Sequence, residues 1–180
     1  MPLRFLLFAV AVLFTHISAR ASIDMFLFVE GVPGESRDSA HAGQCDVLAW
    51  SWGMSNSGTA VGGGGVGSGK VNIQDLSVTK YVDKASTLLM QACATGSHYP
   101  TVKLQMRKAG SAANQHFLVI TMEEVIVTSL STGGSGGEDR LVENVSFNFA
   151  KVTVDYWEQR ADGTYVKGKP FTWDATVVTP

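Results

Sequence analysis

The sequence has little charge imbalance, and this excludes one broad class of function. Its 14 basic and 16 acidic residues give a formal net charge of −2. Binding to nucleic-acid phosphates requires a concentrated positive face, and the longest basic run here is the pair Arg107-Lys108. We therefore expect no nucleic acid among the partners of this chain.

Cysteine is also scarce. Cys45 and Cys93 are the only two, and they lie far apart in the sequence. Two distant thiols make neither a disulfide framework nor a zinc site, which usually needs four closely placed ligands. Because free cysteine behaves as a small hydrophobe, we predict that both are inert packing residues, and we expect no metal site and no cofactor.

No segment after residue 21 approaches the length of a membrane span, but the first 21 residues differ in character. Arg4 precedes ten apolar residues at 5–14, and Ala19-Arg20-Ala21 has the form of an A-x-A cleavage site. This is the layout of a secretory signal peptide, and the run is too short to cross a membrane. Residues 1–21 are therefore a signal-peptide-like prefix to one domain at 22–180. Either the prefix exports the chain to the periplasm, or the true start lies downstream of residue 1.

From residue 22 onward the dominant hydrophobic period is two residues, which is typical of strands. Val102, Leu104 and Met106 alternate with polar neighbours, and residues 46–52 also alternate. Residues 117–127 are apolar on both faces, which predicts a strand covered by core on one side and by a partner on the other.

Two segments change phase midway and therefore predict bends. In the first, Val71 and Ile73 give way to Leu76 on the opposite parity; in the second, residues 145–149 give way to residues 152–156. Such a switch inside a strand indicates a β-bulge or a sharp bend, which lets long strands curl into a barrel. The predicted fold is mainly β, a single closed or nearly closed β-barrel with one flanking α-helix.

The helix is predicted from a stripe of apolar residues at helical spacing. Asp83 is the expected N-cap and Gly96 the expected C-terminal residue. Further along, Asp162-Gly163 predicts a hairpin turn. The stripe consists of Ala85, Leu88, Leu89, Ala92 and Cys93.

Motifs that suggest an enzyme are incomplete. Residues 64–70 nearly match a phosphate-binding loop, but Val71 takes the place of the required hydroxyl, and a strand rather than a helix is expected to follow. His41, His98 and His116 fit no catalytic or metal-binding spacing and are expected at the surface or at strand ends. The neighbouring Glu123 and Glu124 should face opposite sides of a strand. We therefore expect no catalytic residues and no enzyme.

Seven segments stand in a recognisable order and spacing: 24–27 (DMFL), 34–36 (GES), 46–58 (DVLAWSWGMSNSG), 71–84 (VNIQDLSVTKYVDK), 98–100 (HYP), 102–110 (VKLQMRKAG) and 120–156. Together they resemble the haemolysin-coregulated protein family, and the match runs without a gap from about residue 24 to residue 174. The resemblance implies a tube subunit of a bacterial type VI secretion system, in which six-membered rings stack into a hollow tube inside a contractile sheath. It also implies a spike protein at the tube tip, small effector proteins in the lumen, and assembly in the cytoplasm before secretion.

Two groups of residues are candidates for contacts between subunits. The resemblance places an extended loop at 53–69, so Gly53, Gly62, Gly65 and Gly69 are candidate ring-stacking residues. Glu138, Asp139 and Arg140 form either a salt-bridge cluster between loop and strand or a contact between subunits.

Two other functions stay open from the sequence. The first is a free secreted effector or host-binding protein with the same barrel. The second is a nucleotide-handling enzyme, which rests only on residues 64–70.

Overall fold

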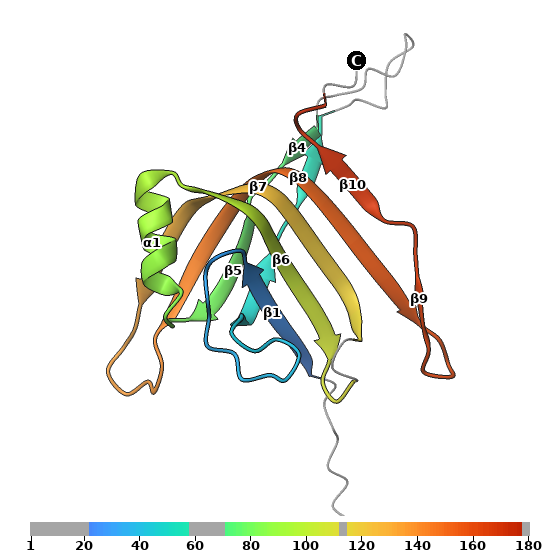
Figure 1. The fold of residues 1–180 in the computed structure, drawn as a ribbon, viewed down its shortest axis with the longest axis horizontal. Helices are drawn as coiled ribbons and strands as arrows, with labels where there is room; N and C mark the ends of the chain where they lie inside the picture. The colour runs from blue at the N-terminus through green and yellow to red at the C-terminus, as the bar shows by residue number, and fades with distance from the viewer. Residues whose placement is uncertain (1–21, 58–70, 112–114, 178–180) are drawn as a thin grey trace, which may run out of the picture.

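Ten strands and one helix make up the part of the chain that the structure, a computed structural model, describes: residues 22–57, 71–111 and 115–177. Figure 1 shows the strands wrapped into a barrel, with α1 lying against one side. The elements in chain order are β1 (Ile23–Val29), β2 (Cys45–Ser51), β3 (Met54–Asn56), β4 (Val71–Ile73), β5 (Leu76–Tyr81), α1 (Ser86–Thr95), β6 (His98–Lys108), β7 (His116–Gly133), β8 (Val142–Gln159), β9 (Tyr165–Lys167) and β10 (Phe171–Asp174).

The barrel closes through one pair of long strands. Around its wall the order is β8, β5, β2, β1, β6 and β7, and β7 pairs with β8 again. This last pairing runs antiparallel from Leu118 opposite Tyr156 to Gly133 opposite Val142. The predicted closed β-barrel with one flanking helix is confirmed.

The interior of the barrel is filled by apolar side chains from every strand of the wall. Leu27, Leu104 and Phe147 are completely buried there. Alternation puts these residues inside, since successive side chains of a strand point to opposite faces. In β6 the predicted alternation is confirmed, because Val102, Leu104 and Met106 are all buried.

Both predicted phase changes coincide with irregular backbone. The first lies between β4 and β5, which are separate strands divided by Gln74 and Asp75. The second lies within β8, whose buried residues switch parity between Phe149 and Val152. On the neighbouring strand β7, Glu124 lies opposite this switch, between the residues that pair with Lys151 and Phe149. Glu124 has a φ of 52°, the only positive φ of a non-glycine residue in the described ranges.

Alternation fails at two places where the sequence predicted it. In β2 the register shifts between Val47 and Ala49, so Trp50 packs against the core instead of continuing outward with the exposed Leu48. In β7 both Glu123 and Glu124 are exposed, although neighbours in a regular strand face opposite sides. In β2 an extra residue breaks the two-residue period, whereas β7 keeps its register at Glu123 and changes parity at the left-handed backbone of Glu124.

Helix α1 packs against the barrel beside β7, with a narrower buried face than predicted. Leu89 and Ala92 are buried, but Leu88 is 43% exposed, so its place on the apolar stripe is wrong. The helix begins at Ser86 with Ala85 preceding it, which also corrects the predicted N-cap. Asp83 lies in the turn that precedes the helix, where its Oδ1 accepts a hydrogen bond from the N–H of Ala85 at 3.0 Å.

The predicted ends of two elements are confirmed. Gly96 closes α1 with a φ of 67°, a left-handed conformation that a residue without Cβ adopts at no steric cost. At the predicted Asp162-Gly163 turn, Gly163 donates its N–H to the carbonyl of Arg160, and β9 returns along β8.

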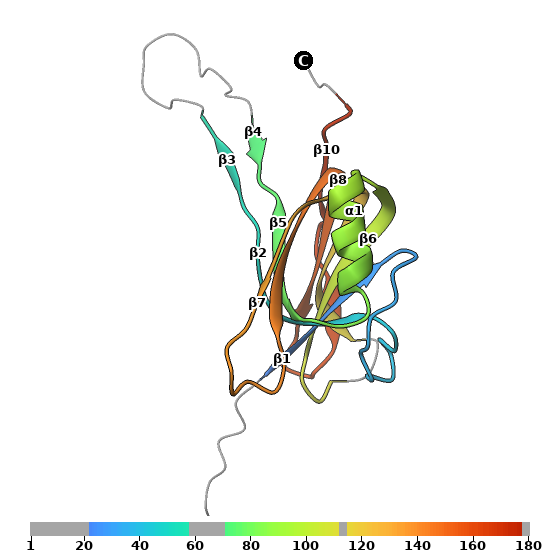
Figure 2. The same ribbon diagram turned by 90° about the vertical axis from the view of Figure 1, so that its left-hand side faces the viewer.

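Four of the described strands extend beyond the closed wall. β10 and β9 pair only with the second half of β8, so each leaves one free strand edge. β3 and β4 pair only with each other and rise from one end of the barrel, as Figure 2 shows. We call this β3–β4 pair the arm.

Candidate functional site

The base of the arm is attached firmly to the barrel. The carbonyl of Gly53 accepts the N–H of Gln74 at 3.0 Å, and the indole N–H of Trp52 donates to the carbonyl of Gln74 at 2.9 Å. The ring centroid of Trp52 lies 6.1 Å from that of Phe149 and 6.4 Å from that of Phe171. These contacts set the direction in which the arm leaves the barrel.

The candidate stacking glycines divide into two groups. Gly53 lies at the base of the arm, whereas Gly62, Gly65 and Gly69 lie outside the described residues. The segment that resembles a phosphate-binding loop, 64–70, also lies outside them. The described chain resumes at Val71 as strand β4, which confirms that a strand and not a helix follows Lys70.

Glu138, Asp139 and Arg140 lie together on the loop that joins β7 to β8, and all three are exposed. Arg140 lies over the ring of Tyr81, with its Cζ 3.8 Å from the ring centroid, a cation–π contact. Within the described residues, none of the three takes part in an ion pair. The loop forms one wall of a surface pocket of about 410 Å³, lined by Leu48, Tyr81, Glu138, Asp139, Arg140 and Val142.

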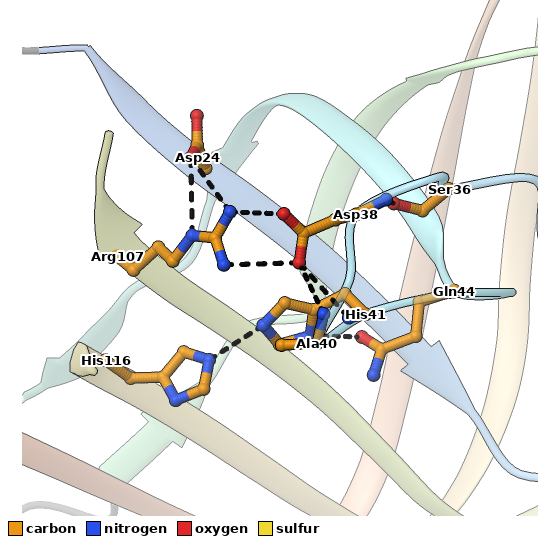
Figure 3. Close-up of polar contacts among 8 residues, drawn as sticks. All are labelled: Asp24, Ser36, Asp38, Ala40, His41, Gln44, Arg107 and His116. Atoms are coloured by element: carbon orange, nitrogen blue, oxygen red, sulfur yellow. Dashed lines mark hydrogen bonds and ion pairs between the residues drawn. The ribbon is translucent and has the colours of Figure 1, made fainter. Parts of the chain in front are cut away.

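A network of ion pairs around Arg107 on the outer face of the barrel could not be predicted from the sequence. Figure 3 shows Arg107, from β6, between the carboxylates of Asp24, from β1, and Asp38, from the loop after β1. Its Nε and Nη2 each lie 3.3 Å from Oδ2 of Asp24, while Nη1 lies 3.2 Å from Oδ1 of Asp38 and Nη2 contacts Oδ2. The hydrogen bond from Arg107 is the largest cause that lowers the pKa of Asp38. The two hydrogen bonds from Arg107 to Asp38 attach the loop to the barrel.

Beside this ion pair lies a pair of histidines. His41 stacks on Phe26, with centroids 4.0 Å apart and planes inclined by 9°. Its Nε2 lies 2.9 Å from Nε2 of His116, and its Nδ1 lies 3.1 Å from Oε1 of Gln44 (Figure 3). His41 is buried, so its expected place at the surface is wrong; His116 does begin a strand, as expected, and is half-buried.

The hydrogen-bond partners define the tautomer of each neutral ring. Oε1 of Gln44 only accepts, so Nδ1 of His41 carries the hydrogen and Nε2 of neutral His41 accepts. Nε2 of His116 must then donate. Burial is the largest cause that lowers the pKa of both rings, and the charge of Arg107 adds to the effect. Both histidines are therefore neutral at pH 7.

No described feature is arranged for metal-based chemistry, and no described helix is long and apolar enough to span a membrane. Within residues 22–57, 71–111 and 115–177, no three His, Cys, Asp or Glu side chains could hold one ion. Cys45 is buried, and burial raises the pKa of its thiol to about 12, while Cys93 packs against the core. The described residues thus form a closed β-barrel with free strand edges and a projecting arm.

Comparison with known proteins identifies the family. The family described as "Type VI secretion system effector, Hcp" matches residues 26–156. The protein hcp1 of Pseudomonas aeruginosa is 60% identical over 142 residues, which cover 79% of this chain and 88% of that protein. The chain belongs to the Hcp family of type VI secretion proteins.

Solved structures agree with this assignment. A structure described as that of a type six secretion system protein is 31% identical, with a TM-score of 0.80, over 86% of this chain and 97% of the other. Hcp1 from Salmonella typhimurium is 32% identical, with a TM-score of 0.68, over 87% and 97% of the two chains.

Proposed function

We propose that this chain is the tube subunit of a type VI secretion system and that six copies close into a ring. Membership in the Hcp family supports the tube role. A closed ring needs two different surfaces on each copy, so that one surface of a subunit meets the other surface of the next. The surfaces at the two ends of β8 differ in this way.

The observation that carries the ring proposal is the contrast between the two ends of β8. At its start lies the β7–β8 loop with Arg140 and the pocket beside Leu48; at its far end lie the free edges of β9 and β10 (Figure 1). Exposed apolar side chains mark the far end, including Phe171 and Val166. A free strand edge offers unpaired N–H and C=O groups to another chain.

Stacking of rings requires a second interface along the ring axis, and the arm is our candidate for it. It leaves the barrel wall at Gly53 and carries the exposed Met54 near its base. Gly53, Gly62, Gly65 and Gly69 belong to the segment that we propose makes this contact. The stacked rings would form the hollow tube.

The same proposal defines the partners. A spike protein caps the tube, sheath proteins surround it, and small effector proteins travel in its lumen. The subunit assembles in the cytoplasm and leaves the cell through the secretion system. Residues 1–21, the signal-peptide-like prefix, lie outside the described residues, and intact-mass spectrometry of protein from fractionated native cells tests which start is used and whether the chain enters the periplasm.

Electron microscopy of the purified chain tests the ring and separates its two interfaces. We expect six-fold rings from the parent. Arg140→Glu should reduce ring formation, because it reverses the charge at the proposed contact, whereas Lys103→Glu, an equal charge change on the outer face of β6, should not. Deletion of residues 62–69 should leave rings and remove tubes. Single barrels under every condition would favour the free secreted barrel protein instead.

A further inference from the structure

The loop that joins β1 to β2 is a compact unit that folds back on itself. The N–H of Gly34 donates to the carbonyl of Gly43 at 2.6 Å, and Ser36 exchanges backbone hydrogen bonds with Gly43 and Gln44 at 3.0 and 2.8 Å. A Cβ at Gly34 would collide with the carbonyl of Gln44, so the two ends of the loop meet only because residue 34 is glycine.

Side chains of two residues in this loop hold it on the outer face of the barrel. Asp38 binds Arg107, and its Oδ1 also accepts the N–H groups of Ala40 and His41 at 3.0 and 3.2 Å. His41 covers Phe26 and contacts His116. Phe26 points outward from β1 and is nevertheless only 5% exposed, because His41 lies on it.

The contact between the two histidines has room for one hydrogen only. With both rings neutral, Nε2 of His116 donates to Nε2 of His41 across 2.9 Å. One added proton can be accommodated at Nδ1 of His116, although it places a charge near Arg107. A second proton would put a hydrogen on both facing nitrogens and bring two cations into contact. The closed loop therefore binds fewer protons than the open loop.

We propose that residues 36–44 form a proton-sensitive latch that is closed at neutral pH and opens when His41 and His116 both take up protons. The opened loop uncovers Phe26 and withdraws Ser36 and Asp38, which line one wall of a surface pocket of about 410 Å³ beside Arg107. The latch requires only this chain and does not depend on the proposed ring.

The surrounding charges do not cancel the effect. Asp38, from the loop, favours the imidazolium forms, and Arg107, from β6, opposes them. Arg107 is itself bound by Asp38 and by Asp24 of β1, so these carboxylates already have a cationic partner. Burial is the largest cause for both rings and lowers both pKa values. Stability from a lowered histidine pKa is present above about pH 6.5 and is lost as the pH falls.

The size of the response follows from the number of protons. Open rings should titrate at their ordinary pKa of about 6.5. Between pH 7 and pH 5 the opening equilibrium should then rise about 25-fold if one extra proton is bound on opening, and about 600-fold if two are bound. Asp38 titrates below this range, since its pKa is lowered from 3.8, so it does not contribute.

Hydrogen exchange of the full chain tests the latch. We would measure the amides of His41, Gly43 and Gln44 from pH 7 to pH 5 and divide each rate by that of unprotected peptide at the same pH. The corrected opening should rise at least 25-fold in the parent and in the control His98→Phe, whose side chain is exposed on β6. In His41→Phe, which keeps a ring on Phe26, the rise should fall below threefold. A flat parent profile, or an equal rise in His41→Phe, overturns the proposal.

Nuclear magnetic resonance of the histidine rings gives a second reading that needs no variant. At pH 7 we expect the hydrogen on Nδ1 of His41 and on Nε2 of His116. Below pH 6.5 the two rings together should take up at most one proton until the loop amides become exposed. Independent titration of both rings near pH 6.5, with the loop still protected, would show that the contact places no limit on proton uptake.

Discussion

The ammonium group of Lys80 lies 2.7 Å from Oε1 of Glu143, and both side chains are completely buried. The same ammonium lies 2.8 Å from Oδ1 of Asp83, just before α1, and Ser86 of α1 donates its hydroxyl to Oε1 of Glu143 at 2.8 Å. Oε2 of Glu143 has no hydrogen-bond partner among the described residues. The pair thus connects β5 and β8 of the barrel to the start of the helix.

Breaking this buried pair should destabilise the fold strongly. Glu143→Ala should lower the free energy of unfolding by up to about 3–5 kcal/mol, because the buried Lys80 would lose one of its two carboxylate partners and the hydroxyl of Ser86 would lose its acceptor. Lys151→Ala, which removes an exposed ion pair with Asp174, should cost under about 1 kcal/mol. Chemical denaturation at pH 7 measures both. Equal losses would mean that burial does not determine the strength of these pairs.

The alkaline limit of stability should depend on two buried groups. Burial alone would lower the pKa of Lys80, but hydrogen bonds to Asp83 and Glu143 raise it above 10.5. Burial raises the pKa of Cys45 to about 12. A group with a raised pKa contributes stability below its unfolded value and loses that contribution as the pH rises. The free energy of unfolding should therefore fall as the pH rises past about 8.5, where the thiol of unfolded Cys45 is half ionised.

Cys45→Ala isolates this thiol, since it should make the profile flatter between pH 9 and pH 10 than in the parent. Cys93→Ala provides the matched control and should keep the parent's slope. If Cys45→Ala had the parent's slope, another group would have to be responsible for the decline.

The buried face of α1 is defined by a pair of neighbours. Leu89→Ala should cost about 2–5 kcal/mol, because Leu89 is completely buried in the core. Leu88→Ala makes the same chemical change at a position 43% exposed and should cost much less. Thermal or denaturant unfolding of both variants measures the difference, and a larger loss at Leu88 would place the wrong face of the helix on the barrel.

The bend in β7 gives an unusual prediction for glycine. Glu124 has a φ of 52°, where a side chain normally costs about 1–2 kcal/mol. Glu124→Gly should therefore leave the free energy of unfolding unchanged or raise it by up to about 1 kcal/mol. Glu123→Gly, one residue earlier, should lower it, because glycine weakens an ordinary strand. A loss at Glu124 as large as at Glu123 would argue against the left-handed backbone at this residue.

The barrel could be predicted because its signals are local. Alternation in β6 places its buried residues, and the turn residues Gly96 and Asp162-Gly163 mark where elements end. The parity switch of residues 145–156 could also be found, since a bend within a strand leaves its trace in the order of apolar residues. These patterns need no knowledge of distant neighbours.

The missed features depend on contacts between distant residues. Arg107 and Asp38 are 69 positions apart, and His41 and His116 are 75 apart. Phe26 follows the outward parity of β1, so its burial depends on a loop whose path no periodic pattern predicts. One trace was present: Gly34-Glu35-Ser36, among the segments that resemble the family, is the start of this loop.

The central claim, that this chain forms rings of six, is tested most directly by the mass of the particles in solution. Light scattering of the purified chain, at protein concentrations from below to above the micromolar range, should give a particle of six times the mass of one 19.2 kDa chain at the upper end. Dilution should shift the particle mass only from six copies towards one. A single-chain mass at every concentration would contradict the account.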